Sequence, residues 1–238
     1  MSESLFKYQV RVSPKGRTVR LRVTVRNGLE VVIPKGYDES KIPGLLERKK
    51  HWVRAALERA ESTRKFFEPE PTWRLPLQIK LPAVGAVWHV TSKQTDAEWV
   101  AVRELDPERL LIFGAIDDQE ACQAALVRWL MRQTHQRLLP RLQSLSLKTG
   151  LRYKRAMVKR QRTRWAGCSK QGTISLNAKL LFLPPMAVDY VITHELCHLA
   201  EMNHSKRFWQ LVEKHYPDYR QMDAQLRDMW KMVPRWAS

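Results

Sequence analysis

The chain has 238 residues, of which 44% are hydrophobic, so it can bury a sizeable core. It has no run of about 18 apolar residues and its first residues lack an apolar secretory segment, which predicts neither a membrane span nor export. The net charge of +18 predicts a polyanionic partner, with nucleic acid first, and the three widely spaced cysteines predict a reduced, cytoplasmic setting without a disulfide framework.

Residues 5–33 alternate apolar and basic side chains, which is typical of half-buried strands. Asn27 and Gly28 lie inside this stretch and predict a tight hairpin turn, because both residue types tolerate positive φ. The segment therefore predicts an antiparallel sheet with a basic outer face.

Residues 38–66 predict a helix that Asp38 or Ser40 caps, since apolar residues recur there near helical spacing. Four prolines over residues 68–85 then predict a linker or loop, with a short strand at Leu77–Leu81.

Residues 86–113 return to strand patterns, and Asp117–Leu147 predict a long amphipathic helix that Pro140 kinks. A strand-rich first part thus precedes a helix-dominated second part. We expect two domains, a β-rich region with one helix over residues 1–115 and a second domain over residues 116–238.

Residues 148–170 form a strip with nine basic side chains and no acid, and Trp165 lies inside it. Such a strip predicts contact with a phosphate backbone and stacking on a base, or else the wall of a cleft for another anionic substrate. Strands are expected over residues 156–183, around turns at Gly167 and Gly172. The basic residues of the strip are Lys148, Arg152, Lys154, Arg155, Lys159, Arg160, Arg162, Arg164 and Lys170.

Two helices are expected after Pro184-Pro185, and the first of them contains the sequence HELCH. Its histidines, His194 and His198, are four residues apart, so they lie on one side of the helix and can converge on one metal ion. Neutral imidazoles bind Zn²⁺ and leave a position open for water, and Glu195 beside them can accept a proton from that water. The motif predicts a catalytic Zn²⁺ site, which other divalent transition metals also fit.

A catalytic zinc usually has three protein ligands, so one more is required. Met202-Asn203 can end the first helix, with Asn203 in a left-handed turn, and Ser205 can cap a second helix over residues 206–214. That arrangement puts His204 on a reversal from which its side chain can reach the metal.

Two carboxylates compete with His204 for the third position. Glu201 lies three residues after His198, and Glu213 lies on the second helix. We favour His204 because imidazole suits zinc and a turn allows the reach. Cys197 faces away from the two histidines of the motif and is expected to be a buried residue rather than a ligand.

The segments RWAGCS and HELCH…NHSKRFW resemble the YgjP-like metallopeptidase-type proteins, which are relatives of the SprT-like zinc proteases. The resemblance also covers VSPKGRTVRLRVTVRNGLEVVIP and KKHWV, so it spans most of the chain. One departure lies at residues 165–168, which read Trp-Ala-Gly-Cys where the family typically has Trp-Gly-Ser-Cys.

The resemblance implies a zincin-type minidomain in the C-terminal half, Zn²⁺ held by His194, His198 and His204, and Glu195 as catalytic base. With the strand pattern described above, the expected fold class is α+β. An antiparallel β-rich N-terminal part is followed by a zincin-like α+β minidomain that carries the HExxH helix.

Three further residues are candidates for contact with substrate. Arg164 is a candidate for stabilising a developing oxyanion, and the alternative is that Arg164 and Trp165 simply pack a strand onto the helix. Asn177 either orders the edge strand beside the site or binds the substrate backbone.

The function expected from these residues is zinc-dependent hydrolysis by a metallopeptidase, with a peptide or protein as substrate. One alternative is a metal-dependent phosphohydrolase that acts on nucleoside triphosphates. Another is a nucleic-acid-associated protease that cleaves DNA-bound proteins, as the SprT-like relatives suggest. A purely structural zinc site is disfavoured, because it has no use for a base at Glu195.

Overall fold

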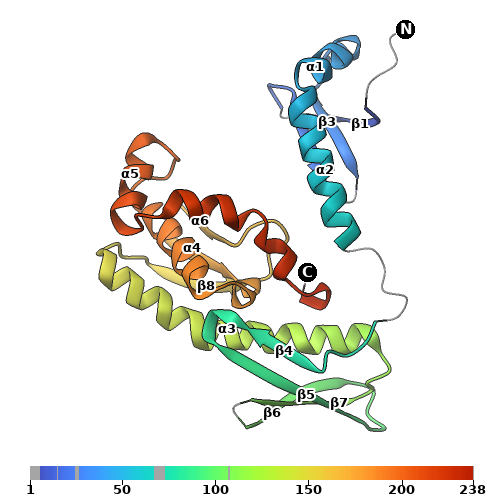
Figure 1. Ribbon diagram of the computed structural model, residues 1–238, viewed down its shortest axis with the longest axis vertical. Helices are drawn as coiled ribbons and strands as arrows, with labels where there is room; N and C mark the ends of the chain where they lie inside the picture. The colour runs from blue at the N-terminus through green and yellow to red at the C-terminus, as the bar shows by residue number, and fades with distance from the viewer. Residues whose placement is uncertain (1–5, 15, 25–26, 67–72, 107, 238) are drawn as a thin grey trace. The chain divides into compact units, whose positions relative to one another are not determined.

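The computed structural model describes residues 6–14, 16–24, 27–66, 73–106 and 108–237 (Figure 1). The chain separates into two compact units, Met1–Thr72 and Trp73–Ser238, and each has its own hydrophobic core. Within the described ranges, no helix combines the length and the apolar character that crossing a bilayer requires.

The first unit is a three-stranded sheet with helices from the following segment, in agreement with the predicted strands and helix. Its elements are β1 (Tyr8–Ser13), β2 (Arg20–Thr24), β3 (Gly28–Pro34), the 3-10 helix η1 (Glu39–Lys41), α1 (Ile42–Arg48) and α2 (Lys50–Phe66). The predicted single helix is interrupted at Lys49, and Asp38 accepts a hydrogen bond from the Ser40 N–H at 3.1 Å.

The sheet of the first unit is mixed, with the order β1-β3-β2, so the prediction of a wholly antiparallel sheet is wrong here. β2 and β3 form the antiparallel hairpin that the Asn27-Gly28 turn predicted, with Gly28 at φ 63°. β1 instead pairs with the other side of β3 in the parallel sense. The turn signal determines the hairpin and carries no information about where a third strand pairs.

The second unit contains two sheets and the remaining helices. The first sheet has the order β4-β5-β7-β6 and the second has the order β8-β10-β9. The strands are β4 (Gln78–Leu81), β5 (Ala86–Gln94), β6 (Val100–Asp106), β7 (Arg109–Gly114), β8 (Arg155–Lys159), β9 (Ala166–Cys168) and β10 (Thr173–Asn177). The α-helices are α3 (Gln119–Thr149), α4 (Pro185–Cys197), α5 (Lys206–His215) and α6 (Tyr219–Leu226), and the 3-10 helices are η2 (Pro82–Val84), η3 (Ala178–Phe182), η4 (Met229–Met232) and η5 (Arg235–Ala237).

Helix α3 is the central element of this unit and lies along one side of the first sheet (Figure 1). Asp118 caps its start by accepting from the Ala121 N–H at 2.9 Å, and the helix continues through Pro140. Trp129 on α3 is fully buried and meets Trp88 of β5 edge to face, with ring centroids 5.4 Å apart. The predicted boundary at residues 115 and 116 therefore falls inside this unit, between β7 and α3, because the sheet and the helix share one core.

Helix α3 is also tied to α4, the helix that carries HELCH. The half-buried Arg141 donates from Nε to Asp189 Oδ1 at 2.6 Å, from Nη1 to the Ala83 carbonyl at 2.9 Å and from Nη2 to the Pro185 carbonyl at 3.0 Å. A planar guanidinium that makes three bonds fixes the start of α4 against both neighbours. The fold is α+β, as predicted, although three α-helices rather than two follow Pro184-Pro185, since α6 was not expected.

Candidate metal centre and active site

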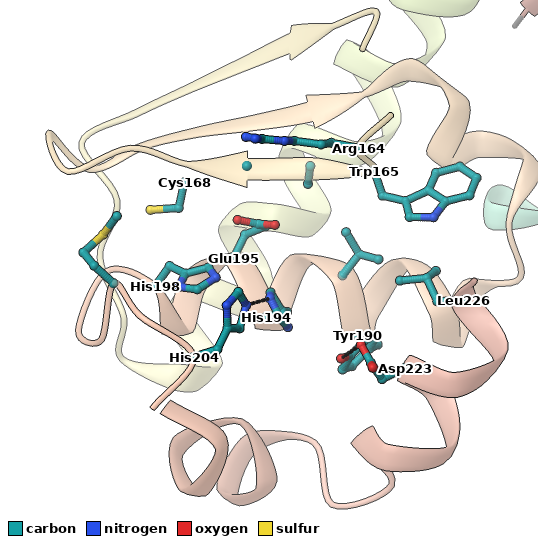
Figure 2. Close-up of a pocket in the computed structure, with 14 residues that line it drawn as sticks. Arg164, Trp165, Cys168, Tyr190, His194, Glu195, His198, His204, Asp223 and Leu226 are labelled. Atoms are coloured by element: carbon teal, nitrogen blue, oxygen red, sulfur yellow. Dashed lines mark hydrogen bonds between the residues drawn. The ribbon is translucent and has the colours of Figure 1, made fainter. Parts of the chain in front are cut away.

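One pocket of the second unit lies between strand β9 and helix α4 (Figure 2). Its volume is about 450 Å³. It contains the three predicted metal ligands, the predicted base and two of the three candidate substrate contacts. Its lining residues are Arg164, Trp165, Ala166, Gly167, Cys168, Tyr190, Val191, His194, Glu195, His198, Met202, His204, Asp223 and Leu226.

Helix α4 presents His194, Glu195 and His198 to this pocket while its opposite face is buried. Pro185 occupies the first turn, where a missing N–H costs nothing, and the helix ends with His198 as C-cap. The helix therefore ends before Met202-Asn203, and no non-glycine residue of the described ranges has a positive φ. The predicted left-handed turn at Asn203 is wrong, because the chain turns earlier. Cys197 is buried, as expected.

His204 lies in the connection between α4 and α5 and returns to the pocket, as the sequence predicted (Figure 2). Ser205 caps α5 by accepting from the Phe208 N–H at 3.3 Å. Phe208 is fully buried and its ring stacks on His198, with centroids 4.4 Å apart. Trp209 stacks on His204 at 5.5 Å, so the first turn of α5 holds two of the three imidazoles in place.

The three imidazoles converge on one point. One possible ligand atom from each of His194, His198 and His204 lies within 4.8 Å of the other two. The Nε2 atoms of His194 and His204 are 3.1 Å apart. Two ring nitrogens at that distance are stabilised by a shared proton or a shared cation, so the donor set fits a metal ion with nitrogen preference.

The protonation state of these rings also suits a metal. Burial, followed by the neighbouring His198 and His204, lowers the pKa of His194 to about 4. Burial likewise lowers the pKa of His198. Both rings are therefore neutral at neutral pH, which is the form that binds metals. His198 Nδ1 lies 3.1 Å from the Glu201 carbonyl, which only accepts, so Nδ1 donates and Nε2 stays available as a ligand.

The predicted base, Glu195, lies beside the histidines and below Arg164 in Figure 2. Burial raises the pKa of the Glu195 carboxyl to about 7, although the Cys168 N–H, which donates to the carboxylate, and the Arg164 charge act in the lowering direction. A carboxyl with a pKa near 7 can accept a proton and return it at neutral pH, which is what general acid–base catalysis requires.

Arg164 and Trp165 are adjacent in sequence but differ in environment. Arg164 is exposed at the pocket. Trp165 is only 7% exposed, and its ring stacks on Trp230 of η4 with centroids 3.8 Å apart and an interplanar angle of 16°. Lys179 lies over the other ring of this stack, with its Nζ 5.4 Å from the Trp230 centroid. Trp165 thus packs the strand segment against the C-terminal helices, while Arg164 remains available to a substrate.

Asn177 is fully buried and does not line the pocket. Its side-chain amide donates to the carbonyls of Gln161 and Arg164 at 2.8 and 2.7 Å, and its Oδ1 accepts from the Lys179 N–H at 3.1 Å. All polar groups of this side chain are engaged by the backbone. Its contacts order the segment that leads into β9 and leave nothing for a substrate.

We expect Asn177→Asp to lower the free energy of unfolding by about 2 kcal/mol or more, because a carboxylate cannot donate to two buried carbonyls. Chemical denaturation of the two proteins measures this difference. Asn203→Asp, the same change at an exposed position, is expected to stay within about 0.5 kcal/mol of wild type. Equal stability of Asn177→Asp and wild type would contradict the role given to Asn177.

The carboxylates that compete for the third ligand position are not in the histidine group that the described residues form. Glu201 contributes its backbone carbonyl to His198, and Glu213 pairs with Arg220 at 3.4 Å.

Tyr190 and Asp223 also line the pocket, and neither was predicted from the sequence as a site residue. The buried Tyr190 hydroxyl donates to Asp223 Oδ1 at 2.9 Å (Figure 2). Tyr190 lies one helical turn before His194, so helical spacing alone can place it on the same side. Asp223 comes from α6 and has no such signal.

An HExxH helix next to a short sheet, with a third histidine after the helix, defines a metallopeptidase-type hydrolase with a zincin-like α+β fold. The model of the YgjP-like metallopeptidase domain matches residues 17–229, and the chain belongs to this family.

Other comparisons add little to this assignment. Among solved structures, the crystal structure of the metallopeptidase zymogen of Pyrococcus abyssi abylysin is similar at 27% identity, over 37% of this chain and 89% of that one, with a TM-score of 0.34. The comparison with curated proteins finds no match.

Proposed function

We propose that this protein is a zinc-dependent metallopeptidase in which His194, His198 and His204 hold the ion and Glu195 is the general base. The observation that carries the proposal is the convergence of three imidazole ligand atoms within 4.8 Å in the pocket that also contains the Glu195 carboxylate. Three nitrogen ligands with a base beside them are typical of catalytic rather than structural zinc.

A bound Zn²⁺ supplies a Lewis acid that makes water nucleophilic at neutral pH. The chain supplies the rest of the chemistry. Glu195 accepts the proton of the attacking water and passes it to the leaving amine. Arg164 places a positive charge at the pocket, where it can balance the negative charge that develops on the carbonyl oxygen.

Strand β9 favours a peptide as substrate. β9 is the edge strand of its sheet and lines the pocket. The Trp165 carbonyl and the Ser169 N–H bond toward β10, so the alternation of an antiparallel pair turns the N–H and C=O of Ala166 away from β10. An extended peptide that reaches these groups through the pocket can add as a further strand, which brings its backbone to the metal centre.

The nucleotide alternative has weaker support from the pocket. Of the nine basic residues in the 148–170 strip, only Arg164 lines it. A triphosphate site needs several cationic or N–H donors around the charged oxygens, and the strip does not supply them there.

The experiment that tests the proposal measures hydrolysis of an unfolded protein, such as casein, before and after metal removal by a chelator. We expect hydrolysis to disappear with the metal and to return when about one equivalent of Zn²⁺ is added. A parallel assay measures phosphate and pyrophosphate release from nucleoside triphosphates.

The two assays separate the candidate functions. Peptide cleavage that depends on Zn²⁺, without phosphate release, supports the metallopeptidase. Zinc-dependent release of pyrophosphate without peptide cleavage would replace it with the phosphohydrolase. Full peptide cleavage after complete removal of the metal would overturn both.

A further inference from the structure

The β4-β5-β7-β6 sheet has one face against α3 and one face turned away from it. The inner face contributes Trp88, Val90, Leu110 and Ile112 to the core. Because side chains alternate along a strand, the residues between these positions lie on the outer face. Lys93, Phe113 and Ala101 form one row across that face by register, and Thr91, Leu111 and Arg103 form the next.

An aromatic platform occupies the outer face at its central strand. The Phe113 ring is half-buried and meets Trp99 edge to face, with centroids 5.6 Å apart. Trp99 itself is 55% exposed, although it is among the largest apolar side chains of the unit. Ala101, the register neighbour of Phe113 on β6, is too small to cover the ring.

Two cations lie beside this platform. The Arg103 guanidinium lies 5.3 Å from the centroid of the Phe113 ring, and Lys93 is the register neighbour of Phe113 on β5. Arg109 lies farther along the same face and pairs with Asp106 at 3.2 Å. Lys80 and Lys93 form no ion pair within the described part of the chain, so their charges are available to an anionic partner.

A sheet face that combines an exposed tryptophan and a half-buried phenylalanine with cations fits single-stranded nucleic acid better than a duplex. Unstacked bases can stack on Trp99 and Phe113, while lysine and arginine contact the phosphates. A duplex hides its base faces and leaves the exposed tryptophan without a partner. The net charge of +18 provides attraction toward either nucleic acid.

The 148–170 strip offers no equivalent platform. Of its two aromatic residues, Trp165 is only 7% exposed because Trp230 covers its ring, and Tyr153 is partly buried against the core of the second unit. The stacking that the sequence predicted for Trp165 is therefore blocked by the fold.

We propose that the outer face of the β4-β5-β7-β6 sheet binds single-stranded nucleic acid, with Trp99 and Phe113 as base-stacking residues and Lys93 and Arg103 as phosphate contacts. This binding is separate from the metal centre and does not depend on the proposed hydrolysis. It gives the hydrolase a means of localising to single-stranded DNA or RNA.

The test measures fluorescence anisotropy of labelled 20-nucleotide oligo-dT and oligo-U with the full chain at low salt. We expect Trp99→Leu to bind at least about 5-fold more weakly, the lower end of the loss of one stacking contact. Trp99→Phe is expected to retain most of the affinity, since it keeps an aromatic face. Lys93→Gln is expected to reduce the slope of log K against log salt by about one.

The matched control is Trp52→Leu, which removes a tryptophan of the first unit that is 45% exposed. It is expected to bind like wild type. Binding of either oligonucleotide with this pattern supports the proposal, and the two probes show whether DNA or RNA is preferred.

Three results would overturn the proposal. The first is absence of binding to both oligonucleotides at low salt. The second is equal affinity of Trp99→Leu and Trp52→Leu. The third is wild-type affinity in Trp99→Leu together with loss of binding in the double variant Arg152→Gln, Lys154→Gln. The last result would place the contact on the 148–170 strip. Unchanged thermal unfolding of each variant ensures that lost binding is not lost folding.

Discussion

Replacement of Glu195 by Gln is expected to lower kcat for peptide hydrolysis by about 100- to 10,000-fold, the usual contribution of a positioned general base. Glutamine has the same shape and keeps an oxygen that can accept from the Cys168 N–H, so the pocket stays intact. It has no group that takes a proton at neutral pH. Steady-state kinetics and metal analysis of the same preparation measure the effect, and the zinc content should not change.

Glu201→Gln is the matched control for that variant. Glu201 is close in sequence, but only its backbone carbonyl takes part in the site, through His198 Nδ1. We expect its kcat to remain within a few-fold of wild type. Wild-type activity in Glu195→Gln would exclude Glu195 as the base. A large loss of kcat in Glu201→Gln would show that the Glu201 carboxylate takes part in the reaction, in contradiction to the geometry.

Replacement of His204 by Ala is expected to weaken zinc binding by more than about 100-fold, because a direct ligand disappears. Loss of a residue that only hydrogen-bonds to a ligand already weakens metal binding by about 10- to 100-fold. His204 belongs to the only histidine, cysteine and carboxylate group that the described residues bring together for a metal. Zinc content after dialysis against a weak chelator measures the change. Wild type should retain about one ion per chain, and the variant should retain little.

His135→Ala provides the control, since His135 is an exposed histidine on α3. Its zinc content should match that of wild type. If His204→Ala keeps its zinc and Glu213→Gln loses it, the carboxylate on α5 is the third ligand and the assignment of His204 is wrong.

The local part of the site could be predicted from the sequence. The i, i+4 spacing of His194 and His198 needs only a helix, and Ser205 marks the start of the next helix by its capping chemistry. The same short-range information led to the wrong prediction of a left-handed turn at Asn203, because α4 already ends with His198 as its C-cap. Signals that act over a few residues give the elements and not their exact ends.

Contacts between distant segments could not be predicted. Asp223 reaches the pocket from α6. β1 pairs directly with β3, although β2 lies between these two strands in the sequence. Asn177 had two open interpretations, and only its three backbone partners, which are distant or across a turn, decide between them. Pairing of this kind depends on the whole chain and leaves no local pattern.

The stack of Trp165 on Trp230 has a consequence for synthesis of the protein. The metal ligands and the base are complete once residue 204 has been made, but the wall that carries Arg164 packs on a ring made 26 residues later. Because chains emerge from the N-terminus, a nascent chain holds its ligands before its substrate wall is fixed. A chain that ends before Trp230 therefore contains the three histidines and Glu195 but lacks the ring against which Trp165 packs.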